Sequence, residues 1–193
     1  MSDTLKIGLI VGATRQGRFA DVVLKWFQNK TADRSGFDFD VIDLRDYDLP
    51  HFDEEMAPAY SEPSSGTAGR WNDLLKEYDG FIVLTPEYNH SIPGVLKNAF
   101  DYAFTGWRRK PLGIVGYGPS GAMRAAEHLR VIAINFGMVP VRGAVHIAGA
   151  DFFANMTDRD ADGFPEHLDP TIDELLGDME FWGNLTKPAL ANA

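Results

Sequence analysis

Short apolar runs alternate with stretches of helical periodicity along most of this chain, and no other feature restricts its fold as strongly. The apolar runs predict strands at Leu5–Val11, Phe37–Leu44, Phe81–Thr85, Leu112–Tyr117 and Val139–Ile147. Helical spacing predicts helices at Phe19–Asn29, Thr67–Tyr78, Pro93–Phe104, Ala122–Asn135 and Pro170–Leu185. This alternation favours an α/β fold with a parallel sheet and helices on both faces. With 193 residues and no repeat or linker, we expect one domain, residues 1–193.

Composition excludes several classes of function. The chain has no cysteine, which removes disulfides, thiolate nucleophiles and Cys-ligated metals, so any redox chemistry needs a bound cofactor. A net charge of −10 argues against a nucleic-acid partner. No apolar run approaches the roughly 20 residues that cross a bilayer, so no membrane contact is predicted. The N-terminus leads into a strand without a signal-peptide core, and we expect a cytoplasmic protein.

Three loops follow predicted strands at the edge where parallel sheets bind ligands, at residues 12–19, 86–94 and 116–121. One ligand could therefore touch all three. A fourth connection, residues 45–66, is polar and long, which is typical of a lid or an interface segment.

The first loop reads GATRQG from Gly12, the G-x-x-x-x-G spacing of a nucleotide-binding P-loop. A P-loop continues with Lys and then Ser or Thr, whereas this chain has Arg18 and Phe19, which serve a magnesium-bound triphosphate poorly. Backbone N–H groups at a helix start, with Thr14, Arg15 and Arg18 beside them, suit a single terminal phosphate. The alternative is a capped turn whose arginines face solvent.

The third loop, GYGPSG at Gly116–Gly121, matches the G-x-G-x-x-G of dinucleotide-binding turns. Such turns are followed about 20 residues later by an acid that binds ribose. Here no Asp or Glu lies near that offset, where the chain reads MVPVRGAV, and the next acid after this stretch is Asp151. The glycines are better explained by a flat ligand close to the backbone, or by tight packing of a strand against a helix.

The stretch DRDADGFPEHLD has calcium-loop spacing, with acids or glycine at Asp158, Asp160, Asp162, Gly163 and Asp169. The last position should be a Glu, a proline stands where a hydrophobic residue is usual, and the preceding GADFFANMT is a poor helix. The sequence favours a solvated acidic turn, and we predict no metal site.

The second loop begins with PEYN at 86–89, directly after the fully apolar strand Phe81–Thr85. Polar residues at this edge of a sheet are candidates for a binding site. The alternative is an ordinary turn in which Asn89 or Ser91 caps the next helix. His90 alone is more often structural than catalytic.

Two segments, VGATRQGR and TPEYNHSIPGVLKNAFDY, resemble the NADPH-dependent FMN reductase family, and the resemblance covers residues 1–150. It implies a flavodoxin-like fold, a doubly wound five-stranded parallel sheet in the order 2-1-3-4-5. It also implies FMN as cofactor, NADPH or NADH as co-substrate, and a homodimer or homotetramer.

Carried over by matching position, the family's cofactor contacts fall on ten residues of this chain. Those to the FMN phosphate fall on Thr14, Arg15, Arg18 and Phe19. Those that cradle the isoalloxazine ring fall on Pro86, Glu87, Tyr88 and Asn89, and those that close over its other edge on Ser120 and Gly121. Ala13 replaces a family Ser, and Arg18 stands where Ser is common, so a cation replaces hydroxyl contacts.

The activity implied is hydride transfer from NAD(P)H to FMN and on to a small-molecule acceptor such as a quinone, an azo compound or free flavin. Because the cofactor carries the hydride chemistry, no catalytic side chain is predicted. Two alternatives stay open. One is a flavodoxin-like FMN electron carrier without nicotinamide turnover, and the other is a cofactor-free or calcium-binding interaction module.

Overall fold

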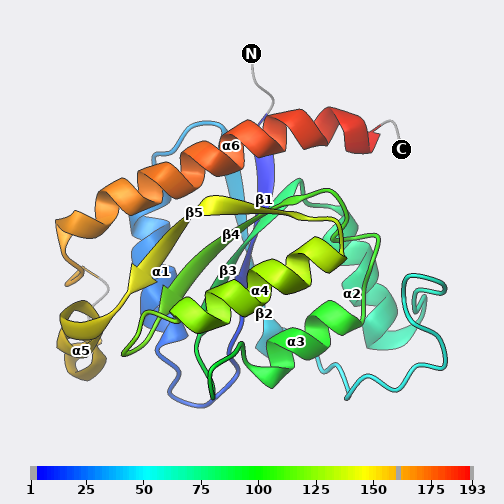
Figure 1. Ribbon diagram of the computed structural model, residues 1–193, viewed down its shortest axis with the longest axis horizontal. Coiled ribbons are helices and arrows are strands. Elements are labelled where there is room, and N and C mark those ends of the chain that lie inside the picture. Colours follow the sequence, from blue (N-terminus) through cyan, green and yellow to red (C-terminus); the bar gives the residue numbers. More distant parts are fainter. Residues whose placement is uncertain (1–3, 160–161, 192–193) are drawn as a thin grey trace.

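A five-stranded parallel sheet forms the centre of the computed structural model, which describes residues 4–159 and 162–191 (Figure 1). The sheet order is β2-β1-β3-β4-β5. The strands are β1 (Leu5–Val11), β2 (Phe37–Asp43), β3 (Gly80–Pro86), β4 (Pro111–Tyr117) and β5 (Val139–Ile147). This confirms the flavodoxin-like α/β fold and the predicted order 2-1-3-4-5.

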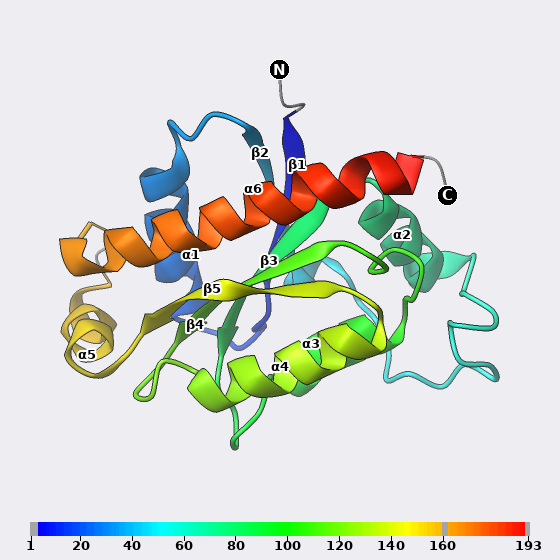
Figure 2. The same ribbon diagram turned by 45° about the horizontal axis from the view of Figure 1, so that its top comes forward.

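Helices cover both faces of the sheet (Figures 1 and 2). On one face lie α1 (Ala20–Thr31) and α6 (Asp169–Ala191), and on the other lie α2 (Gly66–Lys76), α3 (Gly94–Asp101) and α4 (Met123–Asn135). Helix α5 (Gly149–Asp158) follows the end of β5. Two short 3₁₀ helices, η1 (Leu44–Asp46) and η2 (Glu166–Leu168), complete the elements of the described residues.

Burial explains why the strands differ in sequence. Every residue of β3 and β4 is buried, because helices cover both faces, and both strands are correspondingly apolar. Strand β2 lies at the edge, and its sequence FDFDVID mixes apolar residues with three aspartates. The parallel register brings the last residues of neighbouring strands to one edge, with Val11 opposite Leu84 and Thr85 opposite Gly116.

Helix α5 is the main departure from the sequence prediction. The segment GADFFANMT, expected to be a poor helix, forms most of α5. Packing decides this, because Phe152 contacts the ring of Phe19 from α1's N-terminal end. At the other end, Arg159 adopts a left-handed conformation and donates its N–H to the Asn155 carbonyl, which caps the helix. Helix α6 also runs past the predicted end, through Pro188.

The long polar connection between η1 and α2 is pinned to the body of the protein. The Glu62 carboxylate accepts hydrogen bonds from the N–H groups of Phe104 and Thr105, at 2.9 and 2.6 Å. The Asn98 side chain holds the same connection, because it accepts a hydrogen bond from the N–H of Phe52 and donates one to the carbonyl of Pro50. The connection contributes no residue to the pocket described below. In the part of the chain that the structure describes, no helix is both long and apolar enough to cross a membrane.

Candidate functional site

A pocket of about 330 Å³ lies where β1, β3 and β4 end. Its size falls within the range of small-molecule sites, about 300–1,000 Å³. Seven of the predicted site residues line it: Arg15, Arg18, Phe19, Pro86, Glu87, Tyr88 and Ser120. The three loops therefore converge on one cavity, as their positions after parallel strands predicted.

Six further residues line the same pocket: Ala13, Tyr117, Gly118, Pro119, Arg124 and Phe152. Tyr117 is the last residue of β4, so its place at a ligand-binding strand end was a signal that the sequence offered. Phe152 gave no such signal, because it belongs to the unpredicted helix α5. Its ring lies 5.0 Å from that of Phe19, edge to face, and the two form an aromatic wall.

Thr14, Asn89 and Gly121 belong to the same loops but do not line the pocket. Asn89 and His90 form the tip of a two-residue hairpin turn, with φ of +50° and +75°. Gly121 has φ of +62°, and a Cβ there would lie 3.0 Å from the Cβ of Ala148, so this turn favours glycine.

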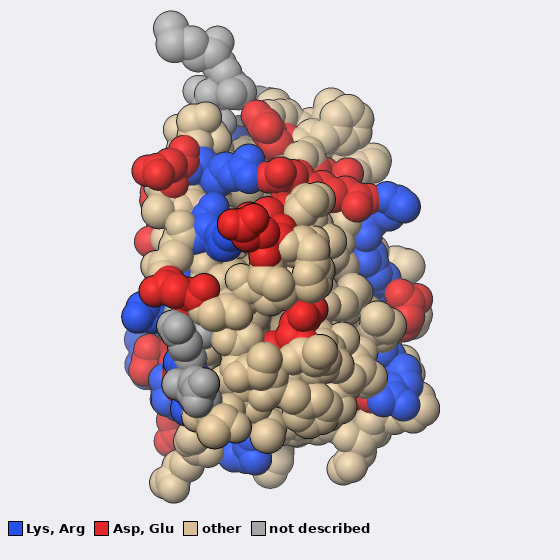
Figure 3. Space-filling model, turned by 90° about the vertical axis from the view of Figure 1, so that its left-hand side faces the viewer, with Lys and Arg blue, Asp and Glu red and all other residues tan. Residues whose placement is uncertain are grey.

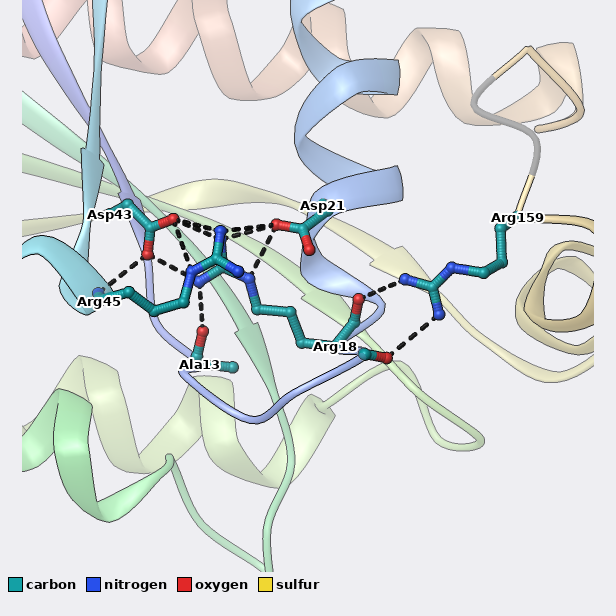
Figure 4. Close-up of polar contacts among 7 residues, drawn as sticks. Ala13, Arg18, Asp21, Asp43, Arg45 and Arg159 are labelled. Atoms are coloured by element: carbon teal, nitrogen blue, oxygen red, sulfur yellow. Dashed lines mark hydrogen bonds and ion pairs between the residues drawn. The ribbon is translucent and has the colours of Figure 1, made fainter.

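Arg18 is the centre of a buried ion-pair cluster beside the first loop (Figure 4). Its side chain is 2% exposed. The guanidinium donates to the Asp43 carboxylate at 2.7 and 2.5 Å and to Asp21 at 2.8 and 2.7 Å. It also donates to the Ala13 carbonyl at 2.6 Å. Arg45 adds a second cation to Asp43, at 2.8 Å.

For both Arg18 and Asp43, ion pairing affects the pKa more strongly than burial does. Burial alone would raise the pKa of Asp43, but hydrogen bonds from Arg18 and Arg45 hold the pKa of this carboxyl well below its usual range. Burial would likewise lower the pKa of Arg18, and its bonds to the two carboxylates raise that pKa instead. Both groups therefore stay charged at neutral pH.

This geometry changes the role expected for Arg18 as a phosphate ligand. All five N–H groups of the guanidinium donate to protein acceptors. A phosphate contact would require the side chain to leave the carboxylates that compensate its buried charge, at a cost of about 3–5 kcal/mol. By contrast, Arg15 is exposed, and no carboxylate in the described part of the chain pairs with it.

Glu87 joins the second loop to the third. Its carboxylate accepts hydrogen bonds from the N–H groups of Arg124 and Ala125, at 3.1 and 3.4 Å, and pairs with the Arg124 guanidinium. Arg124 also donates to the Ser120 hydroxyl at 3.0 Å. Burial would raise the pKa of Glu87, but these contacts outweigh it and lower the pKa. Glu87 is thus a carboxylate that caps α4.

The Tyr117 hydroxyl is the unsatisfied polar group of the pocket. The residue is 3% exposed, and no hydrogen-bond partner for this hydroxyl is present among the described residues. Burial raises the pKa of the phenol, so the group is protonated and can donate. A buried hydroxyl without a partner costs about 1–3 kcal/mol, which a bound ligand could relieve.

The predicted acidic turn lies partly outside the described residues, since Asp160 and the side chain of Asp158 are not among them. Asp162 accepts a hydrogen bond from Asn29, and Asp169 pairs with Lys30 at 2.8 Å. Within residues 4–159 and 162–191, no group of three or more His, Asp or Glu side chains is placed to hold a metal ion.

The side of the molecule that carries α5 is unevenly charged. Seen from that side, acidic and basic side chains gather over the upper part, whereas the lower part is mostly uncharged, with basic and acidic groups toward its edges (Figure 3). The described residues on this side form no continuous positive patch.

Comparison with known proteins gives a consistent result. The model of the NADPH-dependent FMN reductase family matches residues 5–151. An NAD(P)H-dependent FMN reductase of Nectria sp is 32% identical over 164 residues, which are 79% of this chain and 81% of that protein. A 2-hydroxy-1,4-benzoquinone reductase of Burkholderia sp is 32% identical, over 70% of this chain and 73% of that protein. Among solved structures, FerB, an NAD(P)H:acceptor oxidoreductase of Paracoccus denitrificans, shares the fold with a TM-score of 0.62. The two chains are 22% identical, and the match covers 91% of this chain and 99% of FerB.

The Arg18–Asp43 pair makes a prediction about stability. We expect Asp43→Ala to lower the free energy of unfolding by about 3 kcal/mol, because Arg18 keeps a buried charge with one carboxylate fewer. Urea denaturation measures this change. Asp48→Ala, at an exposed carboxylate, is the control and should change stability by no more than about 0.5 kcal/mol.

The same pair predicts a pH dependence. Because the pKa of Asp43 is lower in the folded state, its contribution is present above the ordinary Asp pKa of about 3.9 and is lost as the pH falls below it. The difference in the free energy of unfolding between the native protein and Asp43→Ala, measured by urea denaturation, should therefore shrink in acid. A small difference that does not change with pH would contradict the buried pair.

Proposed function

Because the chain belongs to the NADPH-dependent FMN reductase family, we propose that the pocket at the ends of β1, β3 and β4 is its FMN site. The protein is an FMN-dependent oxidoreductase that takes electrons from NAD(P)H. The observation that carries the assignment of the site is the convergence of three loops on a pocket that joins an exposed cation to aromatic walls. This combination fits a tricyclic ring with a phosphorylated tail.

The first loop fits the phosphate. Arg15 is exposed and can make a charge-assisted contact without breaking an existing ion pair. The loop leads into α1, where the first backbone N–H groups have no helical acceptor and the helix dipole favours an anion. We assign the phosphate contacts to Arg15 and to loop N–H groups, with Arg18 holding the loop from behind.

The second and third loops fit the ring. Pro86 and Tyr88 line one part of the pocket, and Tyr117 and Phe152 line another, so most of the surface that would meet a flat ring is apolar or aromatic. The free Tyr117 hydroxyl can donate to a polar edge of the ligand. Glu87 keeps the two loops together by capping α4 and so fixes the width of the slot.

When bound, FMN supplies the hydride acceptor and passes electrons on to a second substrate. The protein's own task is to bind the ring, to orient it and to exclude water from the covered face. This task uses hydrogen-bond donors and aromatic walls and requires no side-chain nucleophile. Quinones and azo compounds are the proposed acceptors, since relatives of this chain are named as quinone reductases and an FMN-dependent NADPH-azoreductase.

Anaerobic reduction separates the reductase from an electron carrier of the same fold. We expect the FMN-loaded protein to lose its visible flavin absorption when NADPH or NADH is added without oxygen, and to regain it when a quinone follows. An FMN-loaded protein that neither nicotinamide bleaches, although dithionite does, would be a carrier.

The phosphate assignment predicts the effect of Arg15→Ala. Loss of one charge-assisted contact should raise the dissociation constant for FMN about tenfold or more, as measured by quenching of flavin fluorescence on binding to apoprotein. Gln16→Ala, at the exposed neighbouring position, should leave it unchanged. Equal dissociation constants for FMN in the native protein and Arg15→Ala would contradict the assignment of Arg15 to the phosphate site.

We further propose a homodimer in which α4 forms part of the interface. Met123, Val131 and Ile134 are 53%, 69% and 64% exposed, and their spacing places them along one side of α4. A row of exposed apolar side chains on one helix is typical of a protein interface. The row begins beside Arg124, which lines the pocket, so the interface would adjoin the cofactor site.

Light scattering after size exclusion tests the dimer. We expect twice the chain mass of 21.4 kDa for the native protein and the monomer mass for Val131→Glu, because a buried carboxylate opposes association. Val41→Glu makes the same change at an exposed valine of β2 and should stay dimeric. A native protein of monomer mass would contradict the proposal.

A further inference from the structure

Two arginines hold the first loop by its carbonyl groups. Arg18 donates to the Ala13 carbonyl at 2.6 Å. Arg159, the residue that caps α5, donates from its two terminal nitrogens to the carbonyls of Gly17 and Arg18, at 3.1 and 2.5 Å (Figure 4). Three carbonyls of one short loop therefore accept hydrogen bonds from guanidinium groups.

This arrangement fixes the direction of the N–H groups in the same peptide units. All peptide bonds described are trans, and in a trans peptide the N–H points opposite to the C=O. The N–H groups of Thr14, Arg18 and Phe19 are consequently turned away from the guanidinium groups. The N–H of Arg18 closes a turn onto the Arg15 carbonyl at 3.2 Å. Those of Thr14 and Phe19 have no acceptor in the described part of the chain.

Arg159 also connects the loop to a second wall of the pocket. Helix α5 touches the first loop at two places, through Arg159 at its end and through Phe152, whose ring packs on Phe19. Phe152 lines the pocket. Arg159 itself is exposed and does not line the pocket, and it lies beyond the residues 5–151 that match the family.

We infer that Arg159 is a positioning residue for the phosphate of FMN. It binds the carbonyls of Gly17 and Arg18, turns them away from the anion, and leaves the N–H of Phe19 free to donate. Arg18 does the same for the N–H of Thr14 through the Ala13 carbonyl. A loop that is already held in its binding conformation loses less entropy when the anion binds. This inference rests on the proposed FMN site but concerns a residue that would not touch the cofactor.

The planar guanidinium is essential to this role, because one fork reaches two carbonyls at once, whereas a lysine ammonium is a point charge on a flexible stem. Arg159→Lys keeps the positive charge near the loop but loses the fork. A positioning role therefore predicts that Arg159→Lys behaves like Arg159→Ala. A role through long-range charge predicts that Arg159→Lys behaves like the native protein.

The experiment compares FMN with riboflavin, which has the same ring without the phosphate, by fluorescence titration of the apoproteins. For both Arg159→Lys and Arg159→Ala we expect the dissociation constant for FMN to rise about tenfold, while that for riboflavin changes by less than about twofold. Arg130→Lys is the matched control. Arg130 also donates to two carbonyls, those of Val141 and Arg142, but away from the pocket, so its variant should keep the native ratio of the two constants.

Each other outcome overturns the inference. If the dissociation constants for FMN and riboflavin rise equally, Arg159 supports the pocket as a whole and not the phosphate loop. If FMN binding is unchanged in either variant, the residue has no positioning role. If the native apoprotein fails to bind FMN, the proposed function falls as well, and this distinguishes the two failures. Thermal unfolding of each apoprotein verifies that the variants are folded.

Discussion

The buried charge of Arg18 is the constraint on which the first loop depends. A guanidinium that is nearly removed from water must keep all its donors satisfied, and here two carboxylates and one loop carbonyl do so. Asp43 comes from the end of β2, Asp21 from the first turn of α1, and Ala13 from the loop between β1 and α1. One side chain thereby ties the first loop, which lines the pocket, to the end of β2 and the start of α1, and these bonds hold the loop before any ligand arrives.

The other walls of the pocket are held in a similar manner, by polar groups that act on backbone. Glu87 caps α4 and links the second loop to the third, and Arg159 holds the first loop from α5. In the part of the chain that the structure describes, the groups at the pocket without protein partners include the Arg15 side chain, the Tyr117 hydroxyl and the N–H groups of Thr14 and Phe19. This division explains how a pocket can be rigid and still offer donors to a phosphate and to a ring.

The sequence was sufficient to predict the sheet, its order and the convergence of the three loops, because apolar periodicity and the resemblance to a family both report on the fold. The sequence was not sufficient to predict the ion pairs of Arg18. A cation in a phosphate-binding loop looks the same in a sequence whether it faces the ligand or a buried carboxylate. The partner Asp43 lies 25 residues away, and only the pairing of β1 with β2 brings it close. Helix α5, with Phe152, was missed because its stability comes from packing and not from helix propensity.

The most direct measurement is a crystal structure of the protein with FMN bound. We expect the phosphate to lie against the N–H groups of the first loop and the Arg15 side chain, while Arg18 keeps its bonds to Asp43 and Asp21. The opposite result would be an Arg18 guanidinium released from both carboxylates and bound to the phosphate. In that case Arg18 would exchange its carboxylate partners for the phosphate when FMN binds, and the claim that the ion-pair cluster is a fixed support for the loop would be wrong.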